Sequence, residues 1–89
     1  MKVYLELEFQ PGEKSADAHL RKVKRYKHVT LATLEEHEEK HKGWRMMRIT
    51  IEAENEALVR STVQRIRDYF RKHAQLGSSS WKQDGVTNL

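Results

Sequence analysis

Residues 2–9 read KVYLELEF, and this stretch decides the fold. Its apolar side chains occupy every second position, at Val3, Leu5, Leu7 and Phe9. Successive side chains of a β-strand point to opposite faces, so these four share one face. The proline and glycine at residues 11–12 end the strand, because proline lacks an amide proton and glycine permits a turn. We therefore expect a strand with one buried face and one exposed face.

A basic helix is expected next. Ser15 is a favourable N-cap, and Asp17 lies in the first turn, where the helix dipole favours a negative charge. Apolar residues then recur at helical spacing, at Ala16, Leu20 and Val23. Much of the remaining surface is basic, at Arg21, Lys22, Lys24, Arg25 and Lys27. The pattern predicts an amphipathic helix that ends near Tyr26 or Lys27.

A hairpin is expected after this helix. Residues 28–34 are rich in β-branched and apolar side chains, which favour a second strand. Residues 35–42 are all charged or histidine, so we interpret them as the solvated extension and turn of the hairpin. The third strand should open at Gly43 and point Met47, Ile49, Ile51 and Ala53 inward. Its outward side chains would be Trp44, Met46, Arg48, Thr50, Glu52 and Glu54.

A second helix should begin after Asn55, which is also a favourable N-cap. It carries an apolar stripe at Val59, Val63, Ile66 and Phe70, beside a polar stripe at Arg60, Gln64, Arg67 and Arg71. The fold predicted is an α+β, ferredoxin-like βαββα sandwich with both helices on one face of an antiparallel sheet. Residues 1–76 form one domain, and residues 77–89 form a flexible tail or a short fourth strand at the edge.

Composition restricts the function classes. The chain of 89 residues has no cysteine and a formal net charge of +4, with a pI near 9.5. A basic surface favours polyanions such as RNA or DNA, although an excess of charge also simply keeps proteins soluble. Glu6 interrupts the apolar residues of the N-terminus, so we expect neither a signal peptide nor a membrane anchor and place the protein in the cytoplasm.

One stretch resembles a catalytic motif. Residues 37–41 read HEEKH and match the HExxH pattern of zinc proteases, in which two histidines one helical turn apart bind the metal. Residues 35–42 offer no apolar side chain to anchor such a helix, so we interpret the match as fortuitous. We expect no enzyme activity, no metal and no cofactor.

Aromatic and basic residues should meet on the outward face of the sheet. If the first and third strands are adjacent, Tyr4, Trp44 and Met46 share that face, bordered by Lys2, Arg45 and Arg48. Residues 42–49, KGWRMMRI, are similar to the third-strand signature of RNA recognition motifs, with Met46 where a second aromatic would stand. The resemblance implies stacking of unpaired bases on the rings. In the alternative interpretation, Trp44 and Met46 pack against the C-terminal segment, for example Trp81, or against a second copy of the chain.

Two functions follow as hypotheses. The first is a small, non-enzymatic domain that binds nucleic acid, RNA above all. Tyr4 and Trp44 would stack on bases, Arg45 and Arg48 would flank them, and the phosphates would be contacted by Lys22, Lys24, Arg25, Arg60, Arg67 and Arg71. The second is a protein-binding regulator or inhibitor of a larger enzyme, acting alone or as a homodimer through the sheet face or a strand edge. The aromatic face and the basic helices lie on opposite sides, so they could serve different partners.

Overall fold

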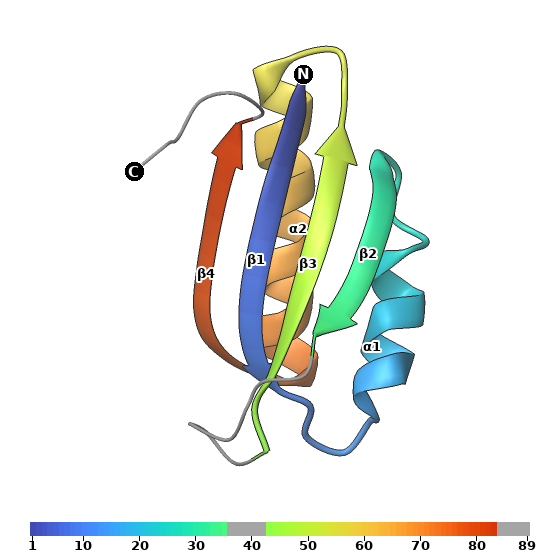
Figure 1. Ribbon diagram of the computed structural model, residues 1–89, viewed down its shortest axis with the longest axis vertical. Helices are drawn as coiled ribbons and strands as arrows, with labels where there is room; N and C mark the ends of the chain where they lie inside the picture. The colour runs from blue at the N-terminus through green and yellow to red at the C-terminus, as the bar shows by residue number, and fades with distance from the viewer. Residues whose placement is uncertain (36–42, 84–89) are drawn as a thin grey trace.

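The computed structural model describes residues 1–35 and 43–83 (Figure 1). Within them the elements are β1 (Lys2–Gln10), α1 (Ala16–Val23), β2 (Val29–Glu35), β3 (Arg45–Glu52), α2 (Glu56–His73) and β4 (Gln75–Gln83). The strands pair antiparallel in the order β2-β3-β1-β4. The described chain is therefore an α+β domain with a four-stranded antiparallel sheet and two helices.

The centre of the sheet follows the expected alternation. Val3, Leu5, Leu7 and Phe9 of β1 are fully buried, and the residues between them are partly exposed. The register pairs Leu5 with Ile49 and Leu7 with Met47, so the apolar face of β1 continues onto β3. Each of these side chains contributes about 1.5 to 3 kcal/mol by leaving water. The period-two pattern of residues 2–9 is confirmed.

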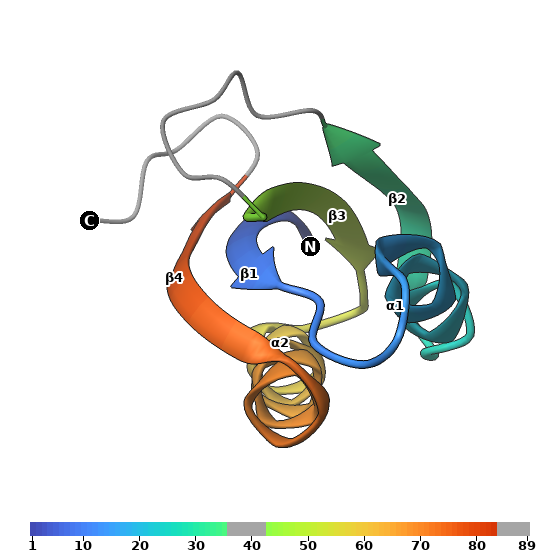
Figure 2. The same cartoon turned by 90° about the horizontal axis from the view of Figure 1, so that it is seen from below.

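Both helices cover the apolar face of the sheet (Figure 2). The N-caps are those expected, because Oγ of Ser15 accepts from the amide of Ala18 and Oδ1 of Asn55 from that of Leu58. Helix α1 contacts β2, whereas α2 contacts β4, β1 and β3. The two helices thus lie over different parts of the sheet, which leaves a space between them for side chains.

Helix α1 differs from its prediction at its end and in its buried face. It ends at Val23 instead of near Tyr26 or Lys27, and His28 has a positive φ of 75° immediately before β2. A residue in this left-handed region redirects the chain, so the second strand begins at Val29. The buried face of α1 is Ala16, His19 and Val23, while Leu20 is only partly buried. A prediction of the buried face from apolar residues alone leaves out His19, because histidine is polar.

Strand β3 also begins later than expected, at Arg45 instead of Gly43. It ends at Glu52, so Ala53 lies just beyond the strand. The solvated extension and turn were expected at residues 35–42, but residue 35 belongs to β2, and residues 36–42 lie outside the described residues.

Strand β4 runs through residues 76 and 77, where the domain was expected to end, and pairs with β1 along its length. The register shifts between Glu8 and Phe9, opposite Gly77. The three serines of residues 78–80 therefore belong to an edge strand of the sheet. Trp81 pairs with Leu5, which places its ring on the helix side, partly buried against the core.

Candidate nucleic-acid interface

The outward face of the sheet carries charges of both signs. Tyr4 pairs with Thr50, Glu6 with Arg48 and Glu8 with Met46, so these side chains share the face away from the helices. The guanidinium of Arg48 lies 3.0 Å from a carboxylate oxygen of Glu35 and 3.6 Å from one of Glu6. By register the same face holds three basic residues, Lys2, Arg48 and Lys82, and four acidic ones, Glu6, Glu8, Glu35 and Glu52. This face is not basic.

Arg45 does not lie on that face. It pairs with Phe9, whose ring is in the core, so its side chain starts on the helix side of the sheet. Its Nε is buried and has no hydrogen-bond partner within the described residues. The expectation that Arg45 borders the aromatic face fails because the strand register gives it the parity of Met47, not that of Met46.

The indole of Trp44 packs against β4. A Cβ atom placed on Gly77 would lie 2.6 Å from Cζ3 and 3.2 Å from Cη2 of Trp44, so the ring occupies the space that any side chain at residue 77 would need. Trp44 is half-buried there. The tryptophan thus meets the C-terminal strand, as the alternative interpretation had it, at Gly77.

Three arginines of the expected phosphate-binding set lie on α2 with protein neighbours. Nε of Arg60 is 3.1 Å from Oε2 of Glu56, and its guanidinium lies 5.3 Å from the ring centre of Trp81. Arg71 lies 3.6 Å from Oδ1 of Asp68. Arg67 is half-buried; desolvation and then repulsion from Arg71 lower the pKa of its guanidinium. These three arginines do not line the groove between the helices that holds the other cations.

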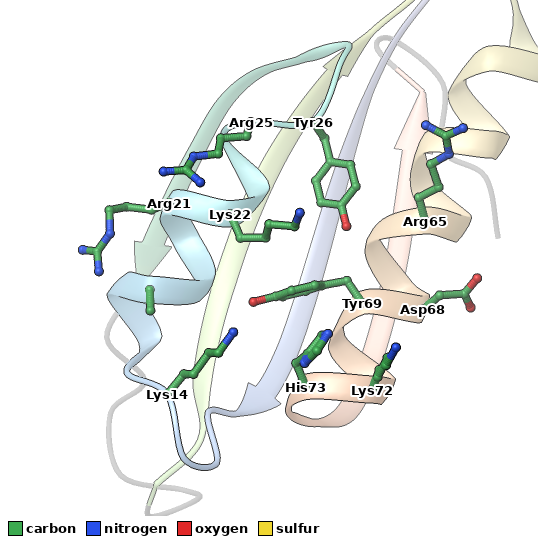
Figure 3. Close-up of a pocket in the computed structure, with 11 residues that line it drawn as sticks. Lys14, Arg21, Lys22, Arg25, Tyr26, Arg65, Asp68, Tyr69, Lys72 and His73 are labelled. Atoms are coloured by element: carbon green, nitrogen blue, oxygen red, sulfur yellow. The ribbon is translucent and has the colours of Figure 1, made fainter.

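The densest group of cations lies between the helices. A groove of about 900 Å³, here called the interhelical groove, opens between α1 and α2 (Figure 3). It includes Lys22 and Arg25 of the expected set, but not Lys24. The described residues that line it are Lys14, Ala18, Arg21, Lys22, Arg25, Tyr26, Arg65, Asp68, Tyr69, Lys72 and His73.

The groove holds a strong excess of positive charge. Six lysine or arginine residues line it against a single carboxylate, that of Asp68. Asp68 already accepts a hydrogen bond from Gln64 at 2.8 Å and lies near Arg71, which is outside the groove. Across residues 1–35 and 43–83, the six basic side chains of the groove form no ion pair. The acids that line the groove therefore balance only a small part of its positive charge.

Two tyrosines form the inner surface of the groove. In Figure 3, Lys22, Tyr26 and Tyr69 point into the space between the helices. Nζ of Lys22 lies 5.4 Å from the ring centre of Tyr26, within the range of a cation–π contact. Desolvation raises the pKa of both phenols; a smaller effect of Arg65 lowers that of Tyr26, and Tyr26 further raises that of Tyr69. Both rings are neutral near pH 7; that of Tyr26 is partly exposed, whereas Tyr69 is buried and its hydroxyl is bonded to His19.

Most of the α2 side of this groove was missed in the sequence. Arg65, Tyr69, Lys72 and His73 are spaced at four, seven and eight residues, which places them on one helical face. This periodicity can be seen in the sequence, but the phosphate contacts were assigned instead to the neighbouring polar stripe from Arg60 to Arg71. The opposing residues on α1 are more than 40 positions away in the sequence, so only the fold reveals the pairing of the two faces.

Within the described residues there is neither a cluster of metal-ligating side chains nor a membrane-spanning helix. Where the structure describes the chain, no three histidine or acidic side chains come together as metal ligands. The HEEKH match at residues 37–41 lies outside the described residues. Neither described helix has the length and apolar character needed to cross a membrane. No known family model matches the chain, and no curated protein matches its sequence.

Proposed function

We propose that this chain is a small, non-enzymatic nucleic-acid-binding protein that binds the phosphates of RNA in its interhelical groove. The observation that carries the proposal is the charge of that groove: six lysine or arginine residues line it beside one carboxylate that is already bonded elsewhere. A polyanion entering the groove relieves the repulsion among these cations and releases its own condensed counterions. Both effects favour binding.

RNA with unpaired bases suits the groove better than a duplex. Tyr26 is half-buried, and its ring points into the space between the helices, where a base can stack on it. Stacking on an aromatic ring contributes about 1 to 3 kcal/mol per base. Lys22 and Arg25 keep the phosphate-contacting role expected of them. Lys24 and three of the arginines of α2, Arg60, Arg67 and Arg71, then belong to the surroundings of the groove.

The role of the sheet face changes in this proposal. The outward face holds Tyr4 beside a network of ion pairs around Arg48, and Trp44 is packed on Gly77. A mixed face of this kind gives no net attraction for phosphates. We therefore assign the binding surface to the helix side of the domain.

The topology we propose is ferredoxin-like. The supporting observations are the strand order β2-β3-β1-β4 and the position of one helix after β1 and one after β3. The location we propose is the cytoplasm, because a chain without cysteine suits a reducing compartment.

Binding to a labelled oligouridylate of about 12 nucleotides, followed by fluorescence anisotropy, tests the proposal. If the groove contacts about four phosphates, the affinity should fall about fiftyfold between about 50 and about 200 mM salt. If adding the protein leaves the anisotropy of the oligouridylate unchanged at the lower salt concentration, the protein does not bind RNA in this way.

One observation favours the second function, a protein-binding regulator. Leu31 is 59% exposed on the edge strand β2, beside a shallow hollow on the outward face that Tyr4 and Thr33 also line. An exposed leucine at a sheet edge suits an apolar side chain of a partner or of a second copy. Co-purification of one stoichiometric protein partner that is lost in Leu31→Ser would favour this function over RNA binding.

A further inference from the structure

Three basic side chains, those of Lys14, Lys72 and His73, line one end of the interhelical groove, and Lys22 lies further along it with its ammonium beside Tyr26. Lys14 precedes α1, Lys22 lies on α1, and Lys72 and His73 lie in the last turn of α2. In Figure 3, Lys14 and His73 face each other from the two walls of the groove. The loop before α1 also approaches this end, because a Cβ atom on Gly12 would lie 3.7 Å from the carbonyl oxygen of His73.

The imidazole of His73 is held in place by its neighbour. Its ring centre lies 4.9 Å from that of Tyr69, at an interplanar angle of 40°. Tyr69 is itself fixed by a hydrogen bond to the buried His19. Tyr69 therefore supports the ring of His73 at the groove, although the side chain of His73 is exposed to solvent.

The free protein disfavours a proton on His73. Desolvation, followed by repulsion from Lys14, Lys72, His19 and Lys22, holds the pKa of His73 below its usual value. On α2 the group also contacts Tyr69, and the carboxylate of Asp68, five residues earlier on the same helix, lines the groove and is bonded to Gln64. A negative ligand at this position would reverse the balance, since it attracts the imidazolium and screens the lysines from it.

We propose that this end of the groove is a phosphate subsite, in which Lys14, Lys22, Lys72 and the imidazolium of His73 hold one phosphate group of the bound RNA. When RNA binds, His73 takes up a proton from the solvent, so the affinity for RNA is higher at lower pH. The inference rests on the proposed function, because it assigns one phosphate of the same ligand to named residues. The carbonyl end of α2 repels an anion, but the basic residues of its last turn, Arg71, Lys72 and His73, offset this effect.

The direct test is a pH titration of the His73 Cε1 proton by NMR, in the free protein and with saturating oligouridylate. The signal is assigned by its loss in His73→Gln. We expect the midpoint to move to higher pH in the complex. A rise of about one pKa unit corresponds to an affinity about tenfold higher at the acid end of the titration than at the alkaline end.

Substitutions at two histidines test whether His73 is the side chain that takes up the proton. In His73→Gln the gain in affinity at low pH should be largely lost, while binding at high pH persists. The matched control is His28→Asn, which removes an imidazole that does not line the groove. Asparagine tolerates the positive φ of residue 28, so this control should keep the pH dependence of the wild type.

The outcomes separate the two proposals. If oligouridylate binds but the midpoint of His73 stays in place and His73→Gln keeps the wild-type pH dependence, the phosphate subsite is wrong and RNA binding stands. If oligouridylate does not bind at low salt at any pH, both proposals are wrong.

Discussion

The hydroxyl of Tyr69 donates a hydrogen bond to Nδ1 of His19 across 2.7 Å, and this bond joins α2 to α1. For the neutral imidazole this direction follows from the other ring nitrogen, since Nε2 lies 2.8 Å from the carbonyl oxygen of Pro11, which can only accept, so Nε2 carries the proton and Nδ1 accepts. His19 is fully buried and packs against the rings of Phe9 and Phe70. The pair lies beneath the interhelical groove and sets the distance between its two walls.

Tyr69→Phe should lower the free energy of unfolding by about 1 to 3 kcal/mol, because it leaves Nδ1 of His19 buried without a partner. Urea unfolding of both proteins measures the difference. Tyr26→Phe is the matched control: within residues 1–35 and 43–83 its hydroxyl makes no hydrogen bond, so its removal should change stability by less than about 0.5 kcal/mol. Equal costs for the two variants would show that the His19 bond does not stabilise the fold.

Gly77→Ala should cost about 1 to 3 kcal/mol, because the new methyl group would overlap the ring of Trp44 and lie 3.3 Å from the carbonyl oxygen of Glu8. Trp44→Leu shortens the side chain that causes the overlap. In a double-mutant cycle measured by urea unfolding, Gly77→Ala should therefore cost less in the Trp44→Leu background than in the wild type. Additive costs would contradict the packing of Trp44 on β4.

Stability should depend on pH through His73. Its folded pKa is depressed, so the unfolded chain binds the proton more readily, and the contribution of His73 to stability is lost as the pH falls from about 7 through the usual histidine pKa of about 6.5. Unfolding of wild type and His73→Gln across this range isolates the effect. The stability of the variant relative to wild type should improve as the pH falls. A difference that stays constant, or moves in favour of the wild type, would contradict the repulsion at this position.

The sequence revealed those parts of the fold that depend on a local period. The alternation of residues 2–9 predicted the buried face of β1, and Ser15 and Asn55 predicted the beginnings of both helices. The burial of His19 was not predicted, because it depends on Tyr69 and Pro11, which lie outside α1. The serines of residues 78–80 resemble a linker by composition and become a strand only because the edge of β1 is available for pairing.

The candidate site was harder to predict for the same reason. Lys22 and Lys24 carry the same charge two positions apart, yet only Lys22 lines the groove. Which cations converge depends on the distance between α1 and α2, and no pattern within either helix contains that distance. Arg45 illustrates a second limit, since its face depends on the strand register with Phe9.

The most direct measurement compares two double variants, Lys22→Gln/Arg25→Gln and Lys24→Gln/Lys27→Gln, in binding to oligouridylate across a salt series. Each removes two positive charges from residues 22–27, but only the first pair lines the interhelical groove. The first variant should bind about tenfold or more weakly, and its salt slope should fall by about 1.4, or about 0.7 for each lost phosphate contact. The second should stay near the wild type. Equal losses in the two variants would contradict binding in the groove.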